Sequence, residues 1–300
     1  MPKGSSVVAE IDGRQLKLTN LDKVLYPSGF TKGEVIDYHA RIAPVYLPHL
    51  RGRALTFRRF PDGTDRPGFF EKRCPDHRPE WVAVALGPGD RRGGIEYCCV
   101  EEPAALVWAG NMAAVEIHAP MARAVDIDTP CAVVFDFDPG PHTDISTCCE
   151  IAVHVREILT AVELEGCCKT SGSKGLQLYV PLNTPGLSHD DAARFALAAG
   201  QVLEKRLPKR VTTVMAKAQR PGKIFVDWSQ NAHHKTTIAP YSLRARPDPT
   251  VSTPVSWEEV ESCADGEIEL RFEPADVLGR VAEHGDLFAP VLELRQRLPG

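Results

Sequence analysis

The sequence lacks the features that define several broad protein classes. It has no run of 18 or more apolar residues, so we expect no membrane-spanning helix. No internal repeat or low-complexity linker interrupts the 300 residues, and shares of 43% hydrophobic and 25% charged residues exclude a disordered or collagen-like chain. Residues 1–6 contain one lysine and no apolar core of a secretory signal. We therefore expect a cytoplasmic globular protein.

The cysteines lack the spacing of a metal or redox site. There are nine, an odd number, and no C-x-x-C motif occurs. Six of them form the adjacent pairs Cys98-Cys99, Cys148-Cys149 and Cys167-Cys168. Neighbouring cysteines rarely bond each other, and these pairs lie in apolar runs. We therefore expect reduced cysteines that pack in the core.

The net charge of -5 conceals an uneven distribution. Residues 204–246 contain ten Lys or Arg but only Glu204 and Asp227 as acids, whereas acidic residues predominate after residue 247. A basic segment in an acidic chain suits a surface that binds phosphates, although it is also typical of a solvated face.

Alternating helix and strand signals predict an α/β fold of the mixed α+β type. Thr31 and Glu34 form a capping box ahead of an apolar helical face that reaches the proline at 48. Further helices are expected at about 103–115, at 144–163 with Asp144 as cap, and at 188–206 with Ser188 as cap. Residues 14–20 are expected to form a strand that enters a turn, and short apolar runs predict buried strands at 131–135, 176–180 and 224–226.

The strongest chemical signal is a strand that ends in two aspartates, Asp136 and Asp138. Residues i and i+2 of a strand face the same side, which places the two roughly 6 to 7 Å apart. Carboxylates this close repel each other unless a cation lies between them, so the motif favours Mg²⁺ or Mn²⁺ and a phosphate-bearing substrate. A simple exit from strand to turn before Pro139-Gly140 is the alternative.

Two further segments could assist such a site. The loop Lys169-Thr-Ser-Gly-Ser-Lys-Gly175 can present Ser171, Ser173, Lys174 and backbone N–H groups to phosphate oxygens, although it could equally be a hairpin turn. Asp227 interrupts an apolar strand, where a carboxylate is costly unless a cation neutralises it, so it is a natural third metal ligand.

Other residues could contact a nucleotide. Residues 235–246 add cations, and arginine at 244 and 246 favours planar phosphate contacts. Phe69 and Phe70 could include a base-stacking platform, although such a pair is usually core. A lone histidine such as His118 is more often structural.

These motifs occur in the order of a known family, from about residue 15 to 260. They are Leu18-Thr-Asn-Leu-Asp-Lys-Val-Leu-Tyr-Pro27, Gly68-Phe-Phe-Glu-Lys72, Glu116-Ile-His118, Val134-Phe-Asp-Phe-Asp-Pro139, Thr170-Ser-Gly-Ser-Lys-Gly-Leu176, Phe225-Val-Asp-Trp-Ser-Gln-Asn231 and Lys235-Thr-Thr-Ile-Ala-Pro-Tyr-Ser-Leu-Arg244. Together they closely resemble the polymerase domain of bacterial ATP-dependent DNA ligase D, in the archaeo-eukaryotic primase superfamily. Since the 300 residues include no ligase or nuclease segment, we expect a stand-alone primase-polymerase.

The resemblance implies a fold and a domain layout. It implies a primase-polymerase fold over residues 1–300, in which a central mixed or antiparallel sheet carries the catalytic carboxylates and helices flank it. The expected subdivision is an N-terminal α/β subdomain at 15–125, a catalytic subdomain at 126–260 and an acidic C-terminal segment at 261–300, with a weak boundary near 120–130.

The resemblance also implies an activity and its site residues. Asp136, Asp138 and Asp227 would be catalytic and hold two ions, Mn²⁺ or Mg²⁺, for template-dependent transfer of NTPs or dNTPs to a DNA 3'-OH. Lys23 and Lys32 would bind the 5'-phosphate of a DNA end. The implied nucleotide-binding residues are Phe69, Phe70, His118, Ser171, Ser173, Lys174, Gln177, Arg220, Gln230, Lys235, Arg244 and Arg246.

The implied partners belong to DNA repair by end joining. They are DNA with gaps or double-strand breaks, preferably 5'-phosphorylated, a Ku-like end-binding protein and a DNA ligase, with association to the nucleoid during action. One departure concerns Gln177, which stands where the family usually has histidine. Glutamine can donate a hydrogen bond to a phosphate but cannot carry a positive charge, so nucleotide binding or rate would be reduced.

Two alternatives compete with a polymerase. A haloacid-dehalogenase-type phosphatase also places D-x-D after an apolar strand, with Asp136 as nucleophile and Asp138 as acid/base. Its usual sequence differs after the motif, however, and it would require a pair of aspartates where Asp227 stands alone. The other alternative is a DNA-end-binding module that has lost turnover through Gln177.

Overall fold

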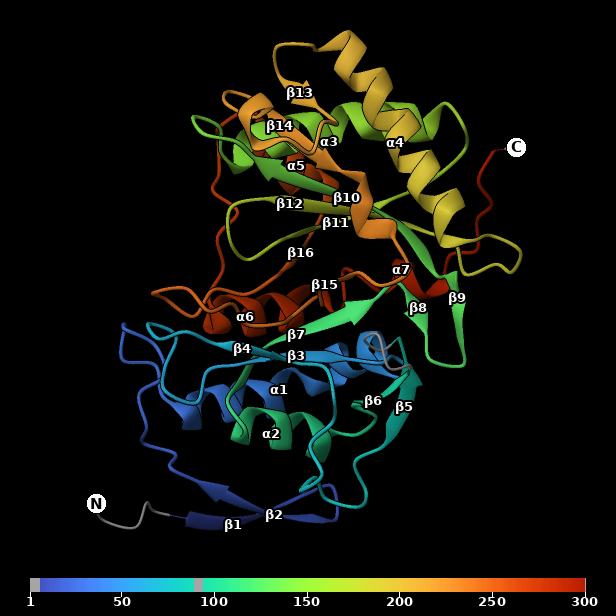
Figure 1. Ribbon diagram of the computed structural model, residues 1–300. Coiled ribbons are helices and arrows are strands. Elements are labelled where there is room, and N and C mark those ends of the chain that lie inside the picture. The colour runs from blue at the N-terminus through green and yellow to red at the C-terminus, as the bar shows by residue number, and fades with distance from the viewer. Residues whose placement is uncertain (1–5, 89–93, 300) are drawn as a thin grey trace. The chain divides into compact units, whose positions relative to one another are not determined.

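The computed structural model describes residues 6–88 and 94–299, which belong to two compact units (Figure 1). Unit 1 comprises Met1–Ala119, Ile238–Val251 and Phe272–Gly285, and unit 2 comprises Pro120–Thr237, Ser252–Arg271 and Asp286–Gly300. The chain after residue 237 thus contributes to both units. The subdomains expected from the sequence, at 15–125, 126–260 and 261–300, are each continuous in sequence. That subdivision stays a prediction.

Unit 1 combines helices with a small sheet. Its helices are α1 (Lys32–Leu50), α2 (Pro103–Asn111) and α6 (Pro274–His284). Its four-stranded sheet has the order β15-β7-β3-β4, built from β3 (Thr56–Arg59), β4 (Phe69–Glu71), β7 (Ala114–Pro120) and β15 (Thr236–Ile238), whose last residue opens the second segment of this unit. Two hairpins complete it, β1 (Ser6–Ile11) with β2 (Arg14–Thr19) and β5 (Val84–Gly87) with β6 (Ile95–Cys98).

The core of unit 1 forms where the apolar face of α1 packs against α2 and the sheet. The capping box expected at Thr31 and Glu34 is present, and the helix continues past Pro48 to Leu50. A proline this close to the end removes only one late backbone hydrogen bond, so the helix tolerates it. The second helix ends at Asn111, before the expected 115, because the backbone turns at Ala113 with a φ of 56° and β7 begins.

Unit 2 is built on a six-stranded sheet. Its strand order is β13 (Val211–Thr212), β14 (Ile224–Asp227), β10 (Ala132–Pro139), β12 (Leu176–Pro181), β11 (Cys167–Thr170) and β16 (Pro254–Val255). Every neighbouring pair is antiparallel except β13 with β14, so the expected central mixed sheet is confirmed.

Helices flank this sheet as expected. Both α3 (Ile145–Thr160) and α4 (His189–Arg206) contact β10, and their predicted caps, Asp144 and Ser188, are confirmed. The remaining elements of this unit are the hairpin β8 (Ala122–Arg123) with β9 (Asp126–Pro130), α5 (Trp257–Ala264), α7 (Pro290–Glu293) and two short 3-10 helices, Lys217–Gln219 and Trp228–Asn231. Among the described residues, no helix has the length and apolar character needed to cross a membrane.

Candidate functional site

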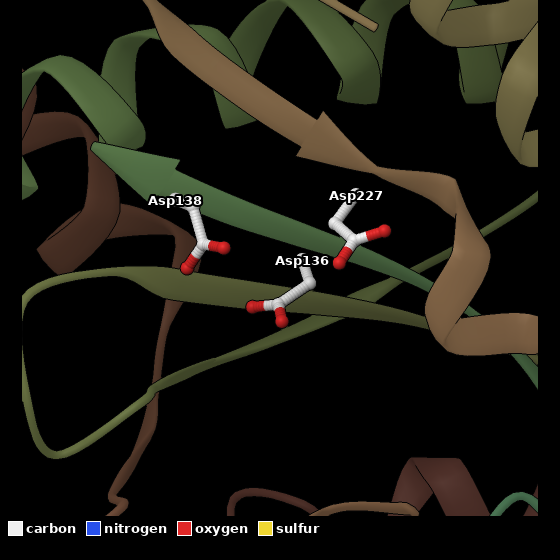
Figure 2. Close-up of side chains that lie close together, drawn as sticks. All are labelled: Asp136, Asp138 and Asp227. Carbon is white, nitrogen blue, oxygen red and sulfur yellow. The ribbon is translucent and has the colours of Figure 1, made fainter. Parts of the chain in front are cut away.

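Three carboxylates converge on two neighbouring strands of unit 2. Asp136 and Asp138 alternate along β10, and Asp227 ends β14, where its Cα is the direct cross-strand partner of Asp136. Figure 2 shows the three side chains turned toward a common space, and one oxygen of each lies within 4.8 Å of the others. The three aspartates therefore lie together, as a shared metal site requires, and their binding of metal stays a prediction.

This cluster is electrostatically costly without a cation. Asp136 and Asp227 are each only 8% exposed, whereas Asp138 is exposed. Burial and the charge of Asp138 raise the pKa of Asp136. Although Asp138 is exposed as a residue, desolvation of its carboxyl group beside the other two and the charge of Asp227 raise its pKa. Carboxylate oxygens are the ligands that Mg²⁺ and Mn²⁺ prefer, and a divalent ion would relieve the repulsion. The donor set thus fits a hard divalent cation held by these three residues.

Neighbouring donors hold Asp227 in place. Its Oδ1 accepts hydrogen bonds from the backbone N–H and the hydroxyl of Ser229, at 3.0 and 2.6 Å. Its Oδ2 accepts one from Nε2 of Gln230 at 3.1 Å. Gln230, expected to bind a nucleotide, thus contacts a candidate metal ligand.

Gln177 holds the carboxylate of Asp136 in a similar way. Its Nε2 donates to Oδ1 of Asp136 at 3.0 Å, and its Oε1 accepts from Nζ of the buried Lys169 at 2.6 Å. The side chain that stands at the family's histidine position is therefore bound to the aspartate cluster.

Two glycines allow backbone segments to pack closely at the end of β10, the strand that carries Asp136 and Asp138. A Cβ at Gly140 would collide with the carbonyl oxygen of Arg220, and one at Gly175 would collide with the carbonyl oxygen of Phe137. These positions flank the strand and the loop singled out in the sequence, so backbone packing requires the glycines there.

Of the expected loop at 169–175, Lys169 and Thr170 are the end of β11, and residues 171–175 form the tight turn that connects it to β12. The hydroxyl oxygen of Ser171 accepts hydrogen bonds from the backbone N–H groups of Ser173 and Gly175, at 3.2 and 3.1 Å. The side chains of Ser173 and Lys174 are exposed. Ser171 therefore stabilises the turn, and the exposed side chains of Ser173 and Lys174 are accessible to an anion.

The basic residues of unit 2 differ in their surroundings. The guanidinium of Arg220 stacks 3.7 Å from the ring centroid of Phe225, and its charge lowers the pKa of Asp138 against the effect of burial. Arg220 therefore borders the carboxylate cluster. Lys235 is half-buried.

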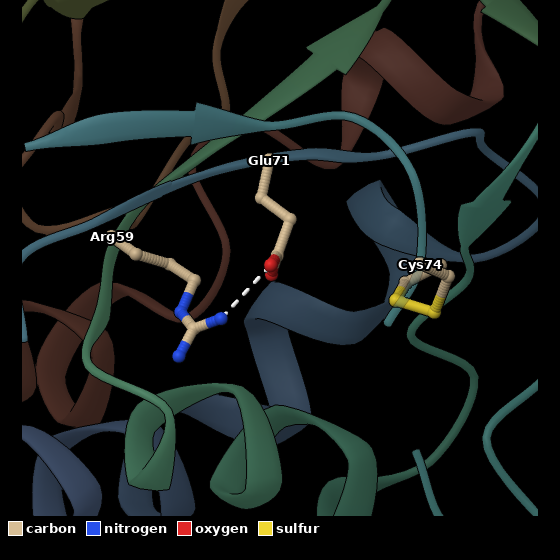
Figure 3. The surroundings of a disulfide bond; sticks show 4 residues. Arg59, Glu71 and Cys74 are labelled. Carbon is tan, nitrogen blue, oxygen red and sulfur yellow. Dashed lines mark hydrogen bonds and ion pairs between the residues drawn. A yellow bond between two sulfur atoms is a disulfide. The ribbon is translucent and has the colours of Figure 1, made fainter. Parts of the chain in front are cut away.

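The adjacent phenylalanines lie on the surface of unit 1. Phe69 and Phe70 in β4 are 45% and 59% exposed, so the core interpretation does not apply to them. The guanidinium groups of Arg59 and Arg58 each lie 5.4 Å from one of these rings, and Arg59 also pairs with Glu71 at 2.9 Å (Figure 3). Residues 69–76 line an open hollow of about 400 Å³. Exposed aromatic faces beside cations suit the stacking of a base.

A disulfide joins Cys74, which follows β4, to Cys98 at the end of β6, and their Cα atoms are 4.8 Å apart (Figure 3). The expectation of reduced cysteines is therefore wrong for this pair. Twenty-four residues separate the two in sequence, and tertiary packing against β6 brings them together, where the backbone N–H of Cys74 donates to the carbonyl oxygen of Glu96 at 2.8 Å. The other cysteines of the described chain are free thiols, and most of them are buried as expected.

In unit 1, the buried carboxylate of Glu116 contacts several cationic and polar groups. Glu116, 1% exposed, accepts from the His118 ring at 3.0 Å and from the backbone N–H of Ala245 at 3.0 Å, and it pairs with Arg58 and Arg244 at 3.4 and 3.2 Å. Burial would raise the pKa of Glu116, but the His118 hydrogen bond and the Arg244 charge prevail and lower it to about 2. His118 and Arg244, both expected to bind a nucleotide, thus contact the same carboxylate.

Two members of this group were not among the expected site residues, Arg58 and Glu116. The side-chain Nε of Arg58 is buried and has no hydrogen-bond partner among the described residues. The double arginine at 58–59 next to aromatic residues is the signal that could have identified it. Glu116 lies within a recognised motif, but only the structure reveals that four groups share its carboxylate. Arg246, by contrast, is exposed.

The expected 5'-phosphate residues lie in a cationic part of unit 1. Lys23 is exposed and lies 3.6 Å from Asp62. Lys32 is buried, and its Nζ donates to the carbonyl oxygen of Thr19 at 2.6 Å. Burial, followed by the charges of Lys23 and Arg59, lowers the pKa of Lys32 to about 8. Three cations that repel one another in this way suit an anionic ligand.

Comparisons with known proteins agree with the sequence motifs. The family described as the LigD primase-polymerase domain matches residues 31–288. The multifunctional non-homologous end joining protein LigD of Mycolicibacterium smegmatis is 45% identical over 281 residues, which cover 92% of this chain and 36% of that protein. The bifunctional LigD of Bacillus subtilis is 30% identical, over 83% of this chain and 40% of its own length.

A solved structure is similar over almost its whole length. The polymerase domain of Mycobacterium tuberculosis ligase D, in complex with DNA, has a TM-score of 0.86 and 39% identity, covering 94% of this chain and 99% of that domain. The chain spans about a third of the length of the mycobacterial relatives, so its action as a stand-alone protein stays a prediction. From the family match and these relatives, the chain belongs to the LigD primase-polymerase domain family.

Proposed function

We propose that this chain is a nucleotidyltransferase that adds NTPs or dNTPs to a DNA 3'-OH at gaps or broken ends, under the direction of a template strand. The observation that carries the proposal is the convergence of Asp136, Asp138 and Asp227 from two adjacent strands. Three carboxylates in this arrangement are the donor set of a two-metal site for phosphoryl transfer. Membership of the LigD family supports a role in end joining.

The three aspartates would hold two ions, for which Mn²⁺ and Mg²⁺ are the candidates. Bound there, divalent ions would lower the pKa of the primer 3'-OH and neutralise the triphosphate and the leaving pyrophosphate. Hydrogen bonds from Ser229 and Gln230 already orient Asp227. A hydrogen bond from Gln177 orients Asp136 in the same way. Such preorganisation reduces the cost of aligning the ligands when substrate binds.

Each unit, taken by itself, offers residues for binding a nucleotide. Phe69 and Phe70 offer exposed ring faces for an incoming base. Ser173 and Lys174, exposed on the β11–β12 turn, would contact the triphosphate. Arg58 and Arg244, the two arginines that pair with Glu116, would bind phosphate oxygens, and His118 would add a polar contact. We extend the same role to Arg220, Lys235 and Arg246.

The DNA end would be bound through its 5'-phosphate by Lys23 and Lys32. The similar polymerase domain of Mycobacterium tuberculosis was solved with DNA, which supports DNA as the ligand here. The relatives are named for non-homologous end joining, and on that basis we propose a Ku-like end-binding protein and a DNA ligase as partners.

Family membership removes one alternative and leaves the other to experiment. A haloacid-dehalogenase-type phosphatase is excluded, since the chain belongs to a polymerase family and its carboxylates lie on antiparallel strands. A module that binds DNA ends without turnover would retain Lys23 and Lys32 and fail to extend a primer.

Primer extension separates these two functions. The substrate is a gapped, 5'-phosphorylated duplex, supplied with NTPs or dNTPs and with Mn²⁺ or Mg²⁺. We expect extension by the wild type, none by Asp227→Ala, and wild-type extension by Asp128→Ala, a matched loss of a carboxylate that is 88% exposed. Gln177→His measures what the family's histidine adds. Binding of the duplex without extension under either metal would overturn the proposed catalysis and support the end-binding module.

A further inference from the structure

One buried cation lies on the same sheet as the carboxylate cluster without being part of it. Lys169 in β11 is fully buried. It is the direct cross-strand partner of Gln177 in β12, which is the partner of Asp136 in β10, which is the partner of Asp227 in β14. Directly opposed residues of antiparallel strands share one face of a sheet, so four polar side chains form a row across four strands.

The chemistry of this row determines the orientation of the glutamine amide. A lysine ammonium only donates hydrogen bonds, and a carboxylate only accepts them. Gln177 lies between the two, at 2.6 Å from Lys169 and 3.0 Å from Asp136. Its oxygen must therefore face Lys169, which leaves its N–H group to donate to Asp136. The opposite orientation would place donor against donor and acceptor against acceptor.

A second contact anchors the lysine itself. Nζ of Lys169 donates to the hydroxyl oxygen of Ser252 at 2.8 Å, and that hydroxyl donates to the carbonyl oxygen of Thr170 at 2.8 Å. Because the Ser252 hydrogen is used on Thr170, its oxygen is available as an acceptor. The ammonium is thus tied to the backbone beside it as well as to Gln177.

We propose that Lys169 is a positioning residue for the metal centre, because it fixes the amide of Gln177 and through it the carboxylate of Asp136. Burying a lysine is costly, and an apolar residue would fill a sheet interior at lower cost, so packing alone does not account for it. Outer-shell groups that orient metal ligands contribute to metal affinity without touching the metal. The inference rests on the proposed metal-dependent function.

A double-mutant cycle on Mn²⁺ binding tests the proposal. The Mn²⁺ affinity of the whole chain is measured by calorimetry for the wild type, Lys169→Met, Gln177→Met and the double variant, with thermal melts to check folding. We expect each single variant to bind Mn²⁺ about tenfold more weakly, as is usual when an outer-shell partner of a ligand is lost. The double variant should bind Mn²⁺ far less than tenfold more weakly than Gln177→Met, since Lys169 acts chiefly through the amide.

Two results would overturn the inference. One is an unchanged Mn²⁺ affinity in Lys169→Met, whether or not its melting temperature falls. The other is a full additional loss of Mn²⁺ affinity when Lys169→Met is added to Gln177→Met, which would indicate a direct effect of charge. If Lys169→Met fails to fold, Ser252→Ala removes one anchor and keeps the lysine. It should weaken Mn²⁺ binding by a smaller factor, and only while Gln177 is present; an unchanged affinity would count against the proposal.

The same titrations distinguish failure of the inference from failure of the proposed function. Asp136→Ala should abolish Mn²⁺ binding. If the wild type does not bind Mn²⁺, or if Asp136→Ala binds it normally, the carboxylate cluster is not the metal centre and the proposed function fails. If Asp136→Ala loses binding while Lys169→Met keeps it, only the role of Lys169 is wrong.

Discussion

Asp136 and Asp227 are directly opposed residues of the antiparallel strands β10 and β14, and Asp138 lies two residues further along the same strand as Asp136. The strand register therefore holds three carboxylates in one place. Their mutual repulsion should affect the stability of the protein. The ion pairs of Glu116 and the disulfide should do so as well, and the cations near Lys32 should affect binding of a 5'-phosphate.

The carboxylate cluster should make the metal-free protein less stable as the pH rises. The pKa values of Asp136 and Asp138 are raised in the folded chain, so the folded state binds protons more tightly than the unfolded state does. This contribution is unfavourable once the pH exceeds the ordinary range of an aspartate. We expect Asp138→Asn to raise the melting temperature in EDTA at pH 7.5, with a smaller gain at pH 5.

Mn²⁺ provides the control for this prediction. The wild type should be stabilised by Mn²⁺ at pH 7.5, because the cation relieves the repulsion, and Asp138→Asn should be stabilised less. An Asp138→Asn variant that melts below the wild type in EDTA at both pH values would contradict the proposed repulsion.

Loss of the charge on Glu116 should destabilise the protein at neutral pH. Its pKa of about 2, against an ordinary 4.5, corresponds to roughly 3 kcal/mol of stabilisation. Because the folded pKa is lowered, this stabilisation is complete above pH 4.5 and is lost as the pH falls toward 2. Denaturant unfolding should show a free energy of unfolding about 3 kcal/mol lower in Glu116→Gln at pH 7. The difference should narrow below pH 4.5; a constant difference would indicate lost packing instead.

Preference for a 5'-phosphate should decline in alkaline solution. The pKa of Lys32 is lowered to about 8, chiefly by burial, so in the free protein its positive charge is mostly present at pH 7 and mostly absent at pH 9. We expect the ratio of affinities for a gapped duplex with and without the 5'-phosphate to fall over this range. The measurement is fluorescence anisotropy at constant ionic strength.

Lys32→Arg is the matched variant, since arginine keeps its charge at both pH values. Its preference for the phosphate should change little between pH 7 and pH 9. A wild-type preference that is equally strong at pH 9 would show that Lys32 does not supply the charge.

The disulfide between Cys74 and Cys98 should stabilise unit 1. A cross-link between residues 24 apart lowers the entropy of the unfolded chain, which raises the free energy of unfolding by roughly 3 kcal/mol. We expect a strong reductant to lower the melting temperature of the wild type and to leave Cys74→Ser/Cys98→Ser unchanged. Cys131→Ser, which removes a free thiol, is the control and should respond to reductant as the wild type does.

Local patterns in the sequence were sufficient for four of the helices, for four of the strands and for the carboxylates. The capping residues Thr31, Asp144 and Ser188 act within one turn of the helices that they begin, so neighbouring residues alone predict them. Asp136 and Asp138 share a face because of the two-residue period of a strand, and the cost of burying Asp227 identified it as their companion. The motifs, in their order, were specific enough to indicate the family.

Only the tertiary structure decided which distant residues share a partner. Lys169, Gln177 and Asp136 form one row because the registers of three strands align them, and no local pattern specifies the register between strands. For the same reason the sequence could not pair Cys74 with Cys98, or place Arg58 and Arg244 on the single carboxylate of Glu116. The sequence by itself thus determined the chemical groups and the family, whereas long-range packing determined which of those groups orient one another.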